Sequence, residues 1–348
     1  MLTSLRTMIP GYKPVETAYL HIGTEKTGTT TLQHYLEQER NDLKNQKILY
    51  PVSGCKKNHW GLLVYAMAAE REDRIKFARK LTDPNKVAAL QETFKQGILD
   101  EAHAHKGMDI VLSLEQLSSR LNDQTELEKI AHLFQSIAKT TKIIVYLRPQ
   151  TEYLTSWYST QVKTGQRTKP FSFPTPADDD FDRYDYQKLL DRWGRVFGKE
   201  NLIVRVFQKS RLLNNNIVDD FLHTLGRIPK AASLKNASLN QSLDPETVEV
   251  LRKLNPHLGP LVSPQGINPH RRGVVTFMES ISDGRPLTIS QENHSEFMSQ
   301  FSKSNAEIAR QYLNISDGRL FDEKPYGPSN FFDSPPQKKR STEFFPVS

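Results

Sequence analysis

The sequence predicts an α/β protein with a parallel sheet of about five strands, flanked by helices and followed by a helical C-terminal cap. Three observations support this prediction. Short apolar runs of strand length recur as far as residue 207, amphipathic helical patterns separate them, and a glycine-containing loop follows the first run. Strands that alternate with helices in this way usually form a sheet whose strands are parallel.

The predicted strands are five runs rich in aliphatic and aromatic side chains. They cover residues 18–22, 47–50, 109–114, 142–147 and 202–207. The third and fourth runs are almost continuously apolar, which is typical of strands in a parallel sheet covered by helices on both faces. We therefore expect both faces of the sheet to be buried.

Helices are predicted between the strands because apolar residues recur there at positions i, i+3 and i+4. This spacing occurs in residues 30–40, 126–138 and 186–197. From about residue 230 onward there is no strong strand pattern, and helical patterns cover residues 245–254 and 294–313. These patterns predict a helical cap over residues 230–325.

The sequence predicts one α/β domain over residues 17–325, which includes this cap. Residues 1–16 contain no apolar core long enough for a secretory signal and are expected to form a short N-terminal arm. Residues 326–348 contain little that could pack, so we expect a mobile tail.

The composition excludes several classes of protein. Hydrophobic residues make up 37% of the chain, and no run approaches the roughly 18 apolar residues of a membrane-spanning helix. The single cysteine, Cys55, excludes an internal disulfide bond and suits the cytoplasm, where we expect the protein. The net charge of +7 comes without a long basic run interleaved with aromatic residues, so we expect no nucleic-acid partner. The charge suits a small polyanion or an acidic polymer.

The loop after the first predicted strand has the order expected of an anion site. A strand, a turn and the start of a helix bring backbone N–H groups and the positive helix end to one place. Gly23 and Gly28 have the spacing of the triphosphatase loop G-x-x-x-x-G-K-[ST], and Thr30 occupies its hydroxyl position. However, Thr29 stands where the lysine should be, and Lys26 lies inside the turn.

The displaced lysine changes the expected ligand. Lys26 could neutralise a leaving group just beyond the first phosphate without a metal ion. Neither of the strands at 109–114 and 142–147 ends in the aspartate that would hold Mg²⁺, and the second ends in Arg148, a ligand for another anion. The sequence therefore predicts a ligand with one phosphate in the loop, a transferable group beyond it, and a second phosphate at Arg148. No metal site is predicted.

Two motifs resemble those of sulfotransferases that use 3′-phosphoadenosine 5′-phosphosulfate (PAPS). The stretch GTEKTGTTTLQ is similar to their 5′-phosphosulfate loop. Residues 143–165 resemble their 3′-phosphate motif, in which an arginine ends a strand and a serine follows eight residues later, as Arg148 and Ser156 do. Residues 184–207 and 217–226 further resemble bacterial members that modify saccharides. The resemblance covers roughly residues 17–325.

The resemblance implies a function and a set of site residues. The chain would transfer the sulfuryl group of PAPS to an acceptor hydroxyl, most readily that of a saccharide or glycan. A lipid-linked acceptor would bring peripheral contact with a membrane. The 5′-phosphosulfate would be held by Lys26, Thr27, Gly28, Thr29 and Thr30, and the 3′-phosphate by Arg148 and Ser156. Many members have Arg-Asp-Pro where this chain has Arg148-Pro149-Gln150.

Two residues are candidates for the general base that takes the acceptor's proton. His59, ranked first, opens a predicted helix after the second strand, where several saccharide-modifying members have a histidine base. Its alternative role is to cap that helix or to pack on Trp60. Glu115, ranked second, lies just past the third strand at the edge where ligands bind in open α/β sheets. Its alternative role is that of an acidic residue in the first turn of a helix.

Other residues have structural interpretations as well. His21, inside the first strand, is interpreted as a hydrogen-bonded core histidine. Residues 270–273, HRRG, could supply an arginine to the 3′-phosphate or to an acidic acceptor, although a basic surface loop is the ordinary interpretation.

Two other functions stay open on the sequence alone. The chain could be a Mg²⁺-dependent nucleotide kinase or triphosphatase with a degenerate loop, and removal of divalent metal would then abolish activity. It could also be a non-catalytic module that binds sulfated or acidic glycans.

Overall fold

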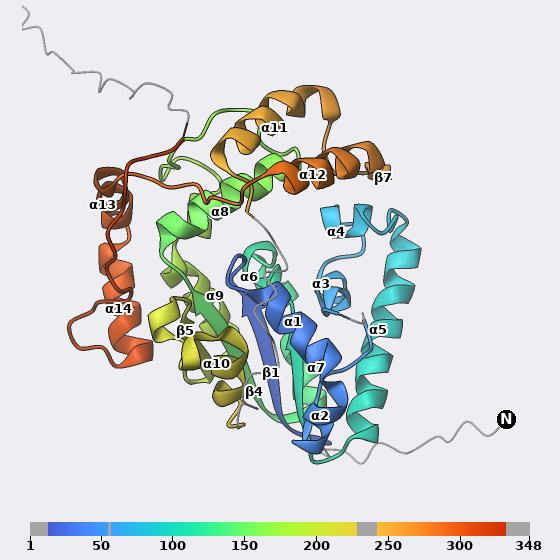
Figure 1. The fold of residues 1–348 in the computed structure, drawn as a ribbon. Coiled ribbons are helices and arrows are strands. Elements are labelled where there is room, and N and C mark those ends of the chain that lie inside the picture. The colour runs from blue at the N-terminus through green and yellow to red at the C-terminus, as the bar shows by residue number, and fades with distance from the viewer. Residues whose placement is uncertain (1–12, 55–56, 228–241, 332–348) are drawn as a thin grey trace, which may run out of the picture.

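A five-stranded parallel sheet forms the centre of the protein in a computed structural model that describes residues 13–54, 57–227 and 242–331 (Figure 1). Its strands are β1 (Val15–Gly23), β2 (Ile48–Leu49), β3 (Asp109–Ser113), β4 (Ala138–Leu147) and β5 (Leu202–Val206). They lie in the order β2-β3-β1-β4-β5, and every neighbouring pair is parallel. All five predicted strands are confirmed, and β1 and β4 begin a few residues earlier than expected.

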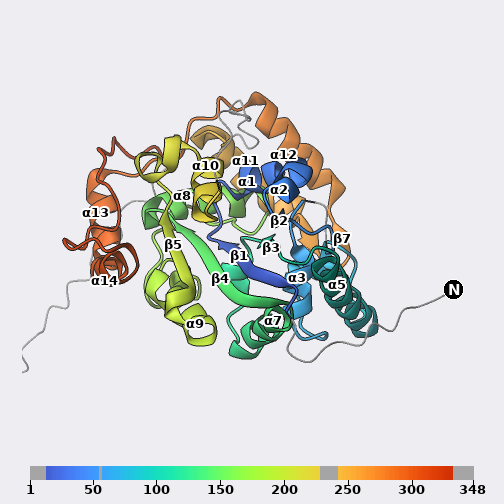
Figure 2. The same cartoon turned by 90° about the horizontal axis from the view of Figure 1, so that it is seen from below.

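Helices cover both faces of the sheet, as predicted (Figure 2). One face carries α1 (Thr29–Gln38), α2 (Arg40–Asn45) and α10 (Ile217–Thr224). The other carries α3 (Trp60–Ala66), α5 (Pro84–Ala104), α7 (Gln124–Ile137) and α9 (Tyr186–Phe197). The predicted α/β fold class is therefore confirmed.

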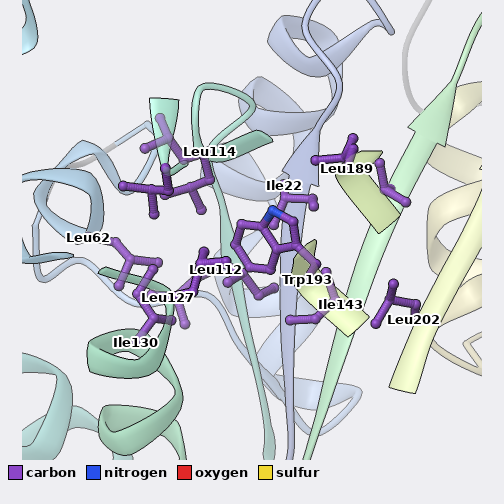
Figure 3. Close-up of a cluster of buried hydrophobic side chains, with 14 of the residues drawn as sticks. Ile22, Leu62, Leu112, Leu114, Leu127, Ile130, Ile143, Leu189, Trp193 and Leu202 are labelled. Atoms are coloured by element: carbon purple, nitrogen blue, oxygen red, sulfur yellow. The ribbon is translucent and has the colours of Figure 1, made fainter. Parts of the chain in front are cut away.

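The alternation of side chains along the strands produces two separate cores. In β3, Ile110 and Leu112 belong to the core under α7 and α9, whereas Val111 belongs to the core under α1 and α10. Figure 3 shows the first of these cores, in which the fully buried Trp193 of α9 lies against the strands near Ile22. Both cores hold the strand ends in place, and the candidate site lies at these ends.

Most helices that surround the sheet begin at a capping side chain. Asp83, Asp123 and Asp185 each accept a hydrogen bond from a backbone N–H in the first turn of α5, α7 and α9, which is the usual role of an N-cap aspartate. Helix α1 differs because its N-cap is Gly28, in the left-handed conformation and without a capping side chain. The first turn of α1 therefore has no capping side chain at its N-terminus.

Four helices follow the sheet in the C-terminal part of the described chain. They are α11 (Pro245–Leu258), α12 (Pro269–Ile281), α13 (Gln291–Ser299) and α14 (Ser302–Leu313). Helices α11 and α12 lie over α8 (Gln150–Lys163), whereas α14 packs against α9 and β5 at the other side of the molecule (Figure 1). A short antiparallel hairpin, β6 (Val262–Ser263) with β7 (Gly266–Ile267), precedes α12 and was not predicted. Residues 230–241 of the predicted cap lie outside the described residues.

The two predicted terminal segments are described only in part. Within the expected arm 1–16, Val15 and Glu16 belong to β1, and residues 1–12 lie outside the described residues. Beyond residue 325 the chain still packs: Tyr326 stacks on His294 and Phe331 stacks on Phe171, each with ring centroids 3.9 Å apart. Packing therefore continues six residues into the segment predicted as a tail, and residues 332–348 lie outside the described part.

None of the helices in the described ranges combines the length and the apolar character that a bilayer-spanning helix requires.

Candidate active site

The loop between β1 and α1 has three residues with positive φ angles: Gly23 at 108°, Lys26 at 67° and Gly28 at 73°. A Cβ atom on Gly23 would lie 2.8 Å from the carbonyl oxygen of Glu115, and one on Gly28 would lie 3.1 Å from the ring of Phe207. Both glycines therefore permit a close approach that a side chain would prevent. Lys26 adopts the left-handed conformation without that freedom, which is uncommon and typical of functional loops.

Hydrogen bonds hold the loop in this shape. The Thr27 hydroxyl donates to the carbonyl oxygen of Thr24 at 2.6 Å. The carboxylate of Glu25 accepts from the Tyr153 hydroxyl at 2.7 Å and pairs with the Arg183 guanidinium at 3.2 Å. Thr27 and Glu25 are buried by these contacts. We conclude that the buried Thr27 side chain stabilises the conformation of the loop.

The ends of β1 and β4 lie side by side, which brings the two sequence motifs together. The register pairs Gly23 of β1 with Val145 of β4. Beyond β4, Arg148 Nη1 donates a hydrogen bond of 2.7 Å to the carbonyl oxygen of Lys26. Arg148 Nε is buried and has no hydrogen-bond partner within the described residues. The arginine is thus attached to the loop through Nη1.

The Arg-Pro-Gln sequence is compatible with this position of Arg148. Pro149 is the N-cap of α8, so the ring that lacks an N–H stands where helices need none. The Tyr186 hydroxyl donates to the Arg148 carbonyl at 2.7 Å, and Gln150 Nε2 donates to the Asn305 side chain at 2.8 Å. The departure from Arg-Asp-Pro therefore leaves the arginine at the strand end.

Glu152 forms an ion pair with Arg148 at 2.9 Å and a second one with Lys324 at 2.5 Å. Burial raises the pKa of the Glu152 carboxyl, but Arg148 and Lys324 more than offset this, so its pKa lies below the usual value. Because Lys324 also neutralises Glu152, Arg148 can turn toward an anion without leaving that carboxylate unpaired.

Two cavities meet at the loop. The first, of about 830 Å³, is lined by Arg148 and Ser156 and is called the Arg148 cavity below. The second, of about 610 Å³, is lined by residues 28–31 and Glu115 and is called the Glu115 cavity. Lys26 and Ser156 line both cavities. The structure therefore brings most of the predicted site residues around one connected space.

The environment of Lys26 suits a role in charge stabilisation. Burial lowers the pKa of its ammonium group, and the positive charges of Lys163 and Arg148 act in the same direction. Glu25 and Glu115 oppose this effect. A cation that is partly removed from water interacts more strongly with a nearby anion than an exposed one does.

Glu115 has the environment of a general base. Burial raises the pKa of its carboxyl, and the nearby charge of Glu25 adds to the effect. A hydrogen bond of 2.8 Å from Gln33 Nε2 and the charge of Lys26 act in the opposite direction. A carboxyl whose pKa is raised toward neutral pH is a stronger base than an ordinary one, while the bond from Gln33 fixes its orientation.

A chain of polar side chains behind Glu115 was not found from the sequence. Gln33 Nε2 also contacts the Ser113 hydroxyl at 3.2 Å, and this hydroxyl lies 2.8 Å from His21 Nδ1. Burial lowers the pKa of His21 to about 3, so the ring is neutral. The contact agrees with the interpretation of His21 as a core histidine. The signal for Gln33 is its place on the apolar face of α1, between Leu32 and Leu36.

His59 lies away from both cavities. Its side chain is fully buried, and its ring packs edge-on against Tyr50. Nδ1 accepts a bond of 3.0 Å from the Ser113 backbone N–H, so the proton is on Nε2, which donates to the Pro51 carbonyl at 3.2 Å. Burial lowers its pKa to about 4, and the ring makes no capping bond to α3. Both nitrogens are thus engaged with backbone, and neither reaches the cavity.

The two arginines of the HRRG segment lie in different environments. Arg271 is fully buried and donates to the carbonyl oxygens of Val162, Lys163 and Gly259 at 3.0, 3.1 and 2.7 Å. These bonds attach α12 to the end of α8, so Arg271 is structural. Arg272 is exposed and lines the Arg148 cavity.

The described residues contain no group of three or more His, Cys, Asp or Glu side chains placed to hold a metal ion.

Comparisons with known proteins give a sequence relative and several solved structures of similar fold. No family model matches the sequence. An uncharacterized protein of Archaeoglobus fulgidus is 28% identical over 221 residues, which cover 62% of this chain and 56% of that protein. The match thus spans little more than half of the relative's length.

Two of the similar solved structures are described as sulfotransferases. A sulfotransferase from Alicyclobacillus acidocaldarius is 15% identical with a TM-score of 0.37, covering 68% of this chain and 93% of its own. The sulfotransferase domain from the curacin biosynthetic pathway is 11% identical with a TM-score of 0.37, covering 84% of this chain and 99% of its own.

Proposed function

We propose that the protein is a sulfotransferase that transfers the sulfuryl group of PAPS to a hydroxyl of a saccharide or glycan acceptor in the cytoplasm. One observation supports the proposal most strongly. The 2.7 Å bond from Arg148 to the Lys26 carbonyl joins the two segments for which anion sites are proposed, each following a strand. A nucleotide with phosphates at its 5′ and 3′ positions has the charge pattern that such a pair would bind.

The residues around the Lys26–Arg148 bond fit such a donor. Arg148 and Ser156 line the same cavity and would hold the 3′-phosphate there. The start of α1, which has no side-chain cap, would receive the 5′-phosphate at Gly28, Thr29 and Thr30. When bound, PAPS would supply a sulfuryl group attached to that phosphate.

The transfer needs one base and one stabilising cation. The acceptor oxygen bonds to sulfur, the bond from sulfur to the 5′-phosphate oxygen breaks, and the acceptor's proton passes to the base. We propose Glu115 as this base rather than His59, because Glu115 lines a cavity together with Lys26 and His59 does not. Lys26 would stabilise the charge that develops on the leaving phosphate. The products are a sulfate ester and 3′-phosphoadenosine 5′-phosphate (PAP).

No specific observation favours the kinase or triphosphatase alternative. Thr29 stands where the triphosphatase loop has its lysine, and β4 is followed by Arg148 rather than by an aspartate. The intact set of Lys26, Arg148 and Ser156 around connected cavities also argues against a purely glycan-binding role.

Substitution of Arg148 by alanine is expected to weaken PAP binding about 10- to 150-fold, because a charge-assisted hydrogen bond contributes about 1.5–3 kcal/mol. Calorimetric titration with PAP in EDTA measures this effect. Arg195→Ala, which removes an exposed arginine of α9, is the matched control and should bind PAP like the wild type. Equal affinity of the wild type for PAP and AMP would contradict the role of Arg148.

Substitution of Gln33 by leucine tests the chain of polar side chains behind Glu115. Without the amide donor the charged form of Glu115 is less favoured, so the acid limb of kcat/KM should move to higher pH. We expect kcat/KM at pH 6 to fall about tenfold, with unchanged PAP affinity. Gln38→Leu, the same substitution at the exposed end of α1, should keep the wild-type pH profile. An unshifted limb in Gln33→Leu would remove Gln33 from the mechanism.

A further inference from the structure

Three arginines, Arg74, Arg79 and Arg120, line the Glu115 cavity. Arg74 belongs to α4 (Arg74–Phe77), and Arg120 belongs to α6 (Leu117–Arg120). Both line the Glu115 cavity together with Trp60, and neither lines the Arg148 cavity. These arginines therefore border the space beside the proposed base and not the space around the proposed 3′-phosphate site.

Two of these three arginines already have partners. Arg120 pairs with Asp73, and Arg79 lies over the Trp60 ring at 4.0 Å and donates to the Ile75 carbonyl at 3.2 Å. The Arg74 side chain is half-buried, and its guanidinium forms no hydrogen bond or ion pair within the described residues. Its five N–H donors face the cavity without a partner in the described part of the chain and are available to a ligand.

The charge around Arg74 is in positive excess. Burial lowers the pKa of Arg74, and the neighbouring charge of Arg120 lowers it further, with Asp73 opposing. Arg74 in turn lowers the pKa of Arg271, whose partners are carbonyl and amide oxygens and not carboxylates. Arg74 and Arg120 thus have the single carboxylate of Asp73 between them. A positive excess in a partly dry cavity attracts an anion strongly.

We propose that Arg74 binds an anionic group of the acceptor, so that the preferred acceptor is an acidic saccharide. This inference rests on the proposed function, because it assigns the Glu115 cavity to the acceptor. A carboxylate or a sulfate ester on the sugar would pair with Arg74, and a hydroxyl of the same molecule would reach Glu115. Trp60, whose ring lies under the Arg79 guanidinium, lines the same cavity.

The test compares binding of three probes to the protein saturated with PAP. The probes are tetragalacturonate, its fully methyl-esterified form, which is neutral, and a tetrasaccharide whose only charged group is one sulfate ester. We expect the wild type to bind at least one acidic probe about tenfold or more tightly than the neutral ester. The stronger of the two acidic probes identifies the anion.

Variants of Arg74 connect this preference to one side chain. Arg74→Met should lose the preference for the acidic probe and keep the wild-type affinity for PAP, which also shows that the variant is folded. Arg74→Lys should keep part of the preference because it keeps the charge. Arg195→Met, an exposed arginine outside both cavities, should behave like the wild type.

Two results would overturn the inference while leaving the proposed function standing. One is a wild type that binds PAP but shows no preference for either acidic probe. The other is an Arg74→Met variant whose affinity for PAP falls as much as its affinity for the acidic probe, since Arg74 would then belong to the donor site. Absence of PAP binding to the wild type would instead reject the proposed function itself.

Discussion

Replacement of Glu115 by glutamine is expected to lower kcat for sulfuryl transfer about 10²- to 10⁴-fold, the range that positioned general bases contribute. Glutamine keeps the shape of the side chain but cannot accept the acceptor's proton. The affinity for PAP should stay within a factor of a few of the wild type, because Arg148 and the loop remain unchanged.

The pH dependence of the wild type gives a second measurement of the same residue. The base must be unprotonated to act, so kcat/KM should rise with pH as Glu115 loses its proton. Since burial raises the pKa of Glu115, this acid limb should lie above the range of an ordinary glutamate. In Glu115→Gln the limb should disappear.

A matched substitution separates catalysis from a general effect of charge. Glu92→Gln removes an exposed carboxylate on α5 and should leave kcat and the pH profile as they are. Near-normal turnover in Glu115→Gln would exclude Glu115 as the base.

Replacement of Arg271 by methionine is expected to lower the free energy of unfolding by about 3–5 kcal/mol, which is large for one substitution. Arg271 is fully buried, and three backbone carbonyls of the α8–α12 junction accept its hydrogen bonds. Methionine fills much of the volume but leaves the carbonyls of Lys163 and Gly259 without a donor, and each such loss costs about 1–3 kcal/mol. Gly165 packs directly on the guanidinium, so there is little space for water to replace it.

Urea unfolding followed by tryptophan fluorescence measures this effect. Arg272→Met is the control, since Arg272 is the next residue and is exposed. It should change the free energy of unfolding by no more than about 0.5 kcal/mol. Equal stability of the two variants would show that the junction does not depend on Arg271.

The sheet could be predicted because its strands are buried on both faces and therefore differ sharply from the helices around them. The adjacency of Lys26 and Arg148 followed from the same reasoning, since both residues were placed at carboxyl ends of parallel strands. The hairpin β6–β7 escaped prediction because each of its strands has only two residues and no periodicity can emerge. The division of the C-terminal helices between two sides of the molecule depends on tertiary packing that no local pattern records.

The choice of base shows what a sequence leaves out. His59 and Glu115 both follow strands, so their positions along the chain are equally suggestive. What separates them is the direction of each side chain: the His59 ring points to the carbonyl of Pro51, whereas Glu115 lines the cavity of Lys26. Gln33 is a similar case, because a polar residue on a buried helix face becomes informative only when its partner is known.

The backbone of Lys26 has a consequence for attempts to engineer this protein. Glycine adopts a φ of 67° without steric strain, whereas an L-residue in this conformation lowers the stability by roughly 1–2 kcal/mol. A screen for thermostability alone would favour glycine at this position and would thereby discard the ammonium group that the proposed chemistry needs. Thermostability and activity are therefore opposed at this residue. Selection for both properties at once must keep lysine, although its backbone is strained there.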